Sequence, residues 1–144
     1  MAESLYETDF YGWTQQQVQL IRSGNLEALD LNNILEELDN MGKSEYRQFS
    51  HRLDILLMHL LKWQFQPEHR SSGWKGSIEE QRFRLTKLLK ENPSMKSKVP
   101  SMMADAYEVA RINAYKETGL AKTAFPGIPP WTIEQAMDSQ FWPD

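Results

Sequence analysis

Apolar side chains recur at three- and four-residue steps along most of the chain, which is the spacing of one face of an α-helix. Strict alternation of apolar and polar residues, the pattern of a half-buried strand, never lasts long enough to predict a sheet. The longest unbroken apolar run has four residues, Ile55 to Met58, whereas a membrane-spanning helix needs roughly twenty. The pattern therefore predicts an all-α fold and no membrane span.

The first part of the chain carries two helical patterns. The first covers residues 10–21, with Thr8 as the expected N-cap and Gly24 as the C-terminal stop. The second follows Asp30 and has one clean apolar face, made of Leu31, Ile34, Leu35, Leu38 and Met41. Gly42 either ends this second helix or lies inside a longer one, where it costs about 1 kcal/mol relative to alanine.

The broadest apolar stripe predicts a central helix over residues 44–63, with Ser44 as its cap. The members of this stripe are Tyr46, Phe49, Leu53, Leu56, Leu57, Leu60 and Leu61. Residues 66–76 are rich in glycine, serine and proline, so we predict a loop there. Ser77 and Glu80 form a capping box, so the next helix is expected to begin at Ser77 and to end at Asn92, before Pro93.

The last part of the chain predicts one long helix and one short helix. The long helix begins near Pro100 and ends at Gly119, a C-cap residue. The proline-rich residues 120–131 are expected to run extended, and Thr132 with Gln135 forms a second capping box. Together these patterns predict an up-and-down helical bundle of four to five main helices with an extended proline-rich C-terminal segment, as a single domain over residues 1–144.

The composition is that of an ordinary soluble globular protein, with 40% hydrophobic and 25% charged residues. The chain has no cysteine, which excludes a disulfide framework, a thiolate zinc site and a cysteine nucleophile. It also favours a reducing compartment, and the acidic start of the chain, Met1 to Phe10, is unlike a signal peptide. We therefore expect a cytoplasmic protein.

The net charge of −4 is unevenly distributed. Residues 1–45 hold nine acids and two bases, residues 46–98 hold eleven bases and five acids, and residues 99–144 hold six acids and three bases. Oppositely charged blocks can attract each other inside one bundle, or the basic block can face an anionic partner. The candidates for contacts with nucleic acid are Arg70, Lys75, Arg84, Lys87 and Lys90, which can equally well solvate an outer helix face.

Five polar residues on neighbouring predicted helices form a candidate cluster: Glu36, Glu37, His59, Lys62 and Arg82. Bundle cores can hold metals through such residues, but the glutamate-x-x-histidine step of di-iron bundles and the H-E-x-x-H pattern are both absent from the sequence. We therefore expect no metal and no cofactor. The simpler interpretation is that Glu37 forms a buried hydrogen bond to His59, Lys62 or Arg82.

Aromatic residues provide the candidates for protein binding. Trp74, Trp131, Phe141 and Trp142 supply large apolar side chains near the predicted end of the bundle. The alternative is that the C-terminal tail closes the open end of the bundle. A nucleophile elbow and a phosphate-binding glycine loop are both absent from the sequence, so we identify no catalytic residues.

Several of these segments occur in one order that resembles a known family. They are Tyr6-Glu7-Thr8-Asp9-Phe10 with Trp13, the Glu36-Glu37 pair in Leu31 to Leu38, His59-Leu60-Leu61-Lys62, Trp74, the helix start at Ser77 to Arg82, Asn92-Pro93-Ser94, and Phe141-Trp142-Pro143. The chain resembles the mainly cyanobacterial domain-of-unknown-function family 29 over nearly its whole length. The resemblance implies a small helical bundle and a bacterial origin, and it implies no activity. One departure is Phe125-Pro126-Gly127-Ile128-Pro129, which has no cysteine where many relatives carry one.

The sequence thus predicts a non-enzymatic protein-interaction or regulatory helical module that binds a protein partner or associates with itself. Two alternatives remain open at this stage. The first is a nucleic-acid-associated protein that uses the basic segment 70–98. The second is a metal-assisted enzyme around Glu37 and His59.

Overall fold

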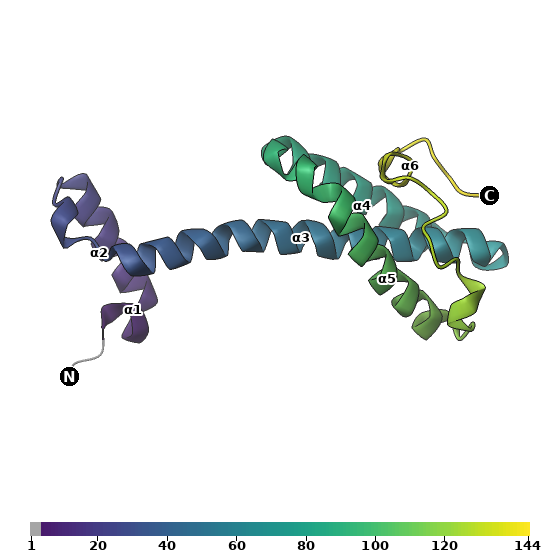
Figure 1. Ribbon diagram of the computed structural model, residues 1–144, viewed down its shortest axis with the longest axis horizontal. Coiled ribbons are helices and arrows are strands. Elements are labelled where there is room, and N and C mark those ends of the chain that lie inside the picture. The colour runs from purple at the N-terminus through teal and green to yellow at the C-terminus, as the bar shows by residue number, and fades with distance from the viewer. Residues whose placement is uncertain (1–3) are drawn as a thin grey trace. The chain divides into compact units, whose positions relative to one another are not determined.

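The computed structural model describes residues 4–144, and every regular element in that range is a helix (Figure 1). The α-helices are α1 (Leu5–Thr8), α2 (Phe10–Arg22), α3 (Leu31–Phe65), α4 (Ser72–Glu91), α5 (Val99–Thr118) and α6 (Ile133–Met137). Short 3₁₀ turns occupy Leu26–Ala28, Pro67–His69, Pro93–Lys98 and Lys122–Ala124. The predicted all-α fold is confirmed. No helix among the described residues is long and apolar enough to cross a membrane.

The longest element, α3, is one uninterrupted helix of 35 residues. The prediction of a separate helix with Ser44 as its cap is wrong, because Ser44 and Gly42 both lie inside α3. No proline interrupts residues 31–65, and a single glycine only weakens a helix by about 1 kcal/mol. Helical propagation therefore continues through Gly42.

The chain divides into two compact units, Met1–Ser44 and Glu45–Asp144. We call them the first and the second unit, and α3 contributes residues 31–44 to one and 45–65 to the other. The first unit is described from residue 4 onward. The single domain over residues 1–144 stays a prediction.

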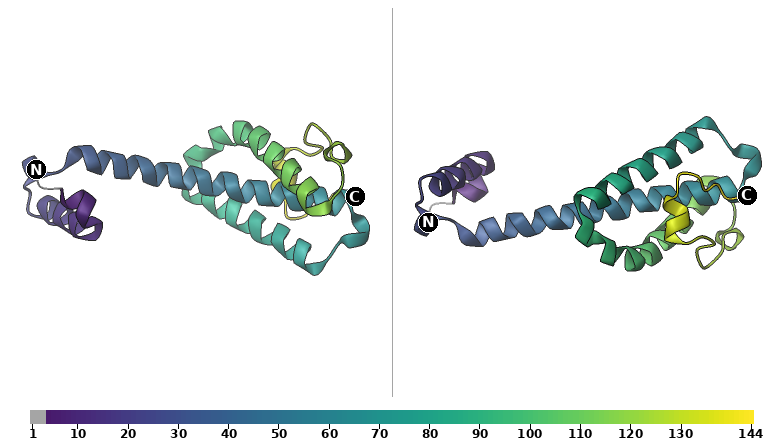
Figure 2. Two further views of the ribbon diagram at one scale, coloured as in Figure 1. Left: turned by 90° about the horizontal axis from the view of Figure 1, so that it is seen from below. Right: turned by 90° about the horizontal axis from the view of Figure 1, so that it is seen from above.

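The second unit contains the hydrophobic core. In both views of Figure 2, α4 and α5 lie beside the second half of α3. Their facing side chains are almost fully buried, with Phe49, Leu56, Ile78, Leu85 and Ala110 each 0% exposed. The predicted central stripe therefore forms the core from Phe49 to Leu61, where helices cover α3 on more than one side, whereas Tyr46 at its start is exposed.

Helix α4 begins at Ser72, five residues before the predicted start at Ser77. Ser71 is its N-cap, since the Ser71 side chain accepts a hydrogen bond of 3.2 Å from the Trp74 backbone N–H. The predicted loop is therefore correct for residues 66–71 and wrong for residues 72–76, and the capping box predicted at Ser77 and Glu80 is wrong. The Glu80 carboxylate instead contacts Arg84, one helical turn further on, at 3.1 Å.

Two other predicted helix boundaries are confirmed. Gly119 follows α5 with φ of 75°, a left-handed conformation that suits glycine. Thr132 and Gln135 form both hydrogen bonds of the predicted capping box at the start of α6. The segment between α5 and α6 carries Phe125 and Trp131 into the core, at 1% and 5% exposure.

In the first unit, α1 and α2 pack beside the first turns of α3. Asp9, and not the predicted Thr8, is the N-cap of α2, because its carboxylate accepts a hydrogen bond of 3.0 Å from the Gly12 N–H. Trp13 is the only buried hydrophobic residue described in this unit, and Gln17 is buried beside it. Residues 4–44 thus have very little core of their own.

Candidate interaction surface

The five residues of the predicted polar cluster have separate partners. Glu37 accepts a hydrogen bond from the Tyr6 hydroxyl within the first unit. This hydrogen bond to a carboxylate raises the pKa of Tyr6 to about 12. Glu36 is exposed on the same helix. The predicted hydrogen bond from Glu37 to His59, Lys62 or Arg82 is not found among the described contacts.

The other three members of the cluster each support the second unit. His59 Nδ1 donates to the Ile55 carbonyl one helical turn earlier at 2.9 Å, and burial lowers the pKa of His59. Lys62, which is 8% exposed, forms an ion pair with Glu117 of α5 at 3.1 Å. These contacts are those of a helical scaffold. Within the described residues, no group of three or more histidines and carboxylates is arranged to hold a metal ion.

Arg82 fastens the C-terminal tail to α4. Its Nε donates to the Ala136 carbonyl and one Nη donates to the Phe141 carbonyl, each at 2.8 Å. Its side chain is 3% exposed and its guanidinium lies 5.3 Å from the Trp142 ring. Burial lowers the pKa of Arg82. Arg82 thus supplies a donor for the Ala136 carbonyl in the last turn of α6 and another for the Phe141 carbonyl beyond the helix.

The four predicted interaction aromatics are built into this end of the second unit. Trp131 is 5% exposed and donates from Nε1 to the Gln64 side chain at 2.7 Å. Trp142 packs on Trp63 with 4.9 Å between ring centroids, and both Phe141 and Trp142 are half-buried against the core. Trp74 is half-buried, with the Lys62 ammonium 5.0 Å from its ring. These contacts support the alternative in which the tail closes the bundle.

Four of the five predicted nucleic-acid residues contact other groups of the protein. Arg84 and Lys87 form ion pairs with glutamates one turn away, and Arg70 donates to the backbone carbonyls of Trp63 and Pro143. Lys75 lies 5.9 Å from the Trp142 ring. Lys90 is exposed on the last turn of α4. The side chains of Arg84 and Lys87 are still 50% and 64% exposed, so a contact of these bases with nucleic acid stays a prediction.

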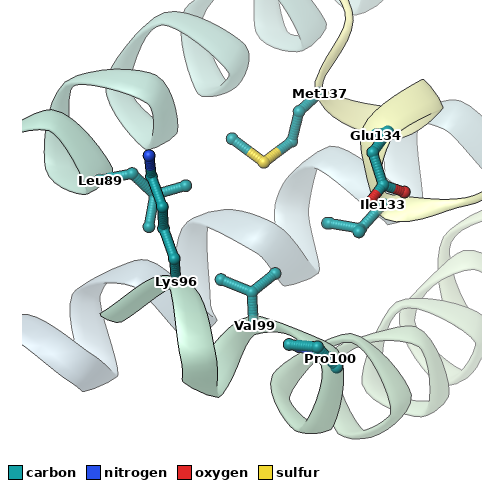
Figure 3. A pocket seen from close by; sticks show the side chains of 7 residues that line it. All are labelled: Leu89, Lys96, Val99, Pro100, Ile133, Glu134 and Met137. Atoms are coloured by element: carbon teal, nitrogen blue, oxygen red, sulfur yellow. The ribbon is translucent and has the colours of Figure 1, made fainter. Parts of the chain in front are cut away.

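One apolar groove lies between α4, the start of α5 and α6 (Figure 3). It holds about 340 Å³. It is lined by Leu89, Lys96, Val99, Pro100, Ile133, Glu134 and Met137. The apolar side chains point into the groove, and it carries only one ammonium and one carboxylate, so its chemistry is that of a shallow hydrophobic depression.

Helix α3 carries more exposed large apolar side chains than any other described helix, and four of them lie in the first unit. We call Leu31, Leu35, Leu38 and Met41 the α3 stripe; their side chains are 64%, 68%, 60% and 64% exposed. The sequence predicts this stripe as a packed helix face, and the structure shows instead that it is uncovered. Only Ile34, at its edge, is half-buried.

The reason lies in how α1 and α2 attach to α3. The indole Nε1 of Trp13 donates to the Asp30 carboxylate at 3.0 Å, and the Tyr6 hydroxyl donates to Glu37. At about 100° per residue, positions 30 and 37 lie to one side of positions 31, 35 and 38. The two short helices therefore cover the flank of α3 and leave the α3 stripe open.

Further apolar side chains of the first unit are also exposed: Leu5, Phe10, Tyr11, Ile21 and Leu26. Sequence reasoning missed this surface, although the signal was present in its periodicity. A helical period shows which residues share a face, but the same period is expected whether that face meets its own chain or another molecule. Only the positions of α1 and α2 distinguish the two cases.

Comparison with known proteins gives one match. No curated protein and no solved structure matches the chain. A family model described as "Domain of unknown function DUF29" matches residues 5–142. This match covers both units and all six α-helices. The chain therefore belongs to the DUF29 family, as its sequence motifs indicate.

Proposed function

We propose that the protein is a non-enzymatic protein-interaction module, with a regulatory role in the bacterial cytoplasm, and that the α3 stripe is its binding surface. The observation that carries this proposal is the exposure of four large apolar side chains, each at least 60% exposed, on one face of one helix. An uncovered apolar face of this kind is typical of helices that bind a partner.

The energetics of the stripe favour a covered state. Complete burial of a leucine or methionine side chain contributes about 1.5 to 3 kcal/mol. The four side chains of the α3 stripe, each roughly two-thirds exposed, would therefore contribute on the order of 5 kcal/mol when a partner covers them. This gain is only about as large as the lower estimates of the free-energy cost of association. Burial of the neighbouring apolar residues therefore also has to contribute to binding.

The small core of the first unit supports the same conclusion. Segments shorter than about 40 residues usually need a disulfide, a metal or oligomerisation to fold. The first unit is about this long, has no cysteine, and buries one hydrophobic residue, Trp13, among residues 4–44. A bound partner would supply the missing apolar contacts.

A charge-introducing variant tests this function. In Leu35→Lys/Leu38→Lys, two ammonium groups occupy the centre of the α3 stripe, and binding would have to desolvate them. We expect quantitative affinity capture from the native cell to recover a specific partner at least tenfold less well with this variant than with the unmodified chain.

The matched control is Asn40→Lys/Ser44→Lys, which adds the same charge at exposed polar positions on other faces of α3. Capture by the control should equal that of the unmodified chain, with circular dichroism confirming equal helix content. Equal recovery by the stripe variant and its control would contradict the proposed function.

A further inference from the structure

We infer that the α3 stripe is covered by the same stripe of a second copy of this chain, with the two helices antiparallel about a two-fold axis. This inference rests on the proposed function and names the partner. A two-fold pairing uses one surface twice, so every contact between the copies occurs in duplicate.

The first observation is Gly42. It lies in the interior of a 35-residue helix, where glycine is the poorest helix former after proline. A Cβ built at Gly42 would meet no atom within 4 Å, so no contact within the described chain requires a glycine. At about 100° per residue, Gly42 lies on the same face as Leu35 and Leu38. A close approach by another chain would explain a glycine at this position.

The second observation is the spacing of the face. Leu31, Leu35, Leu38 and Gly42 follow one another by steps of four, three and four residues. This alternation is that of the seam between two helices in a coiled coil. It is the pattern of a helix that meets another helix along its length.

The seam also defines a register. Suppose that Leu35 of one copy faces Leu38 of the other. Because the two helices run in opposite directions, the residue four positions before Leu35 then faces the residue four positions after Leu38, so Leu31 faces Gly42. A large side chain then packs on a position without one, which is how well-packed cores interdigitate. The two-fold axis repeats each of these pairs, so both copies contribute identical contacts in this register.

The residues beside the seam fit this pairing. On one side, Ile34 lies near Met41 of the second copy, so both flanking side chains are apolar. On the other side, Asn32 lies near Asp39, which already forms an ion pair with Lys43 at 2.9 Å. The Asp39 charge beside the seam is thus paired within its own chain.

The acidity of the first unit makes a salt dependence part of this inference. Residues 1–44 hold eight acids and two bases, so two copies repel each other at low ionic strength. Added salt screens repulsion between exposed charges. The dimer should therefore tighten as sodium chloride is raised from about 50 to 300 mM, whereas a complex with a basic partner would weaken.

Analytical ultracentrifugation of the purified full chain tests the inference. We expect a reversible dimer, and at least tenfold weaker association for Leu35→Lys/Leu38→Lys but unchanged association for Asn40→Lys/Ser44→Lys. Gly42→Leu should also weaken the dimer at least tenfold while keeping or raising helix content, because leucine is the better helix former. A dimer unchanged or tightened by Gly42→Leu would overturn the inference.

Cysteine cross-linking tests the register, and the natural chain has no cysteine to interfere. Within one helix, positions 31 and 42 are about 16 Å apart, too far for a disulfide, so Leu31→Cys/Gly42→Cys can bridge only between copies. We expect an oxidised covalent dimer from this double variant and little from Leu38→Cys alone. Efficient cross-linking of Leu38→Cys alone would indicate a parallel pair and overturn the antiparallel arrangement.

Failure of this inference and failure of the proposed function give different results. A chain that is monomeric at every concentration, but still captures a different protein through the α3 stripe, would overturn the second-copy inference and leave the function standing. A dimer that the stripe variant leaves intact would place the interface elsewhere and overturn the inference as well.

Discussion

Among the carboxyl groups of the second unit, Asp54 is the one whose surroundings most disfavour the ionised form. It lies half-buried on α3, and its Oδ1 has no hydrogen-bond partner in the described part of the chain. Burial raises its pKa from 3.8 to about 6, against the opposing charge of His51. Between those two pH values the folded protein holds a proton that the unfolded chain has lost. Stability therefore falls as the pH rises from about 4 to about 6.

Replacement of Asp54 by asparagine removes this titration. We expect Asp54→Asn to raise the free energy of unfolding by about 2 kcal/mol at pH 8, where the charged carboxylate is fully penalised. At pH 3.5 the variant and the unmodified chain should be nearly equal, since the carboxyl is protonated in the folded state and mostly protonated in the unfolded chain. Urea unfolding at the two pH values measures this difference. A larger effect at pH 3.5 than at pH 8 would contradict the assignment.

At the scale of the element, periodicity predicts helical structure within every long helix, but α3 is predicted as two helices and some caps are placed wrongly. Ser77 and Glu80 satisfy the capping pattern, but Ser71 is the residue that caps α4. The capping-box pattern shows only that two local hydrogen bonds could form at Ser77. The helix begins at an earlier cap when the residues between the two caps also pack as a helix. Here Trp74 lies half-buried beside Lys62, which holds the additional turn in place.

The two serines give a direct comparison at this scale. We expect Ser71→Ala to lower the free energy of unfolding by about 1 kcal/mol, because the Trp74 N–H loses its acceptor. Ser77→Ala, within α4, should change it by less than about 0.5 kcal/mol. Urea midpoints of the two variants decide between the helix starts, and a greater cost at Ser77 would support the capping box.

At the scale of the whole molecule, stability is concentrated in the second unit. Its core holds twenty buried hydrophobic residues, whereas Trp13 is the single one described in the first unit. We expect backbone amides of residues 10–22 to exchange with deuterium faster than those of α4 and α5 when the protein is dilute. Protection of the first unit should rise with protein concentration if a second copy covers it. Uniform protection at every dilution would instead support the single domain predicted from the sequence.

The sequence by itself determined the helices, because their apolar periods and the absence of strand alternation are local properties. Its motifs also indicated the DUF29 family, which the family match confirms. The tertiary structure alone decided which apolar faces are covered and which partner each charge has. Arg82, for example, reaches carbonyls more than fifty residues away. The α3 stripe has the same period as a core face, and it is open only because α1 and α2 attach to the flank of α3. Periodicity depends on residues that are neighbours in the sequence, whereas burial depends on contacts between residues that are far apart in the sequence and that folding brings together.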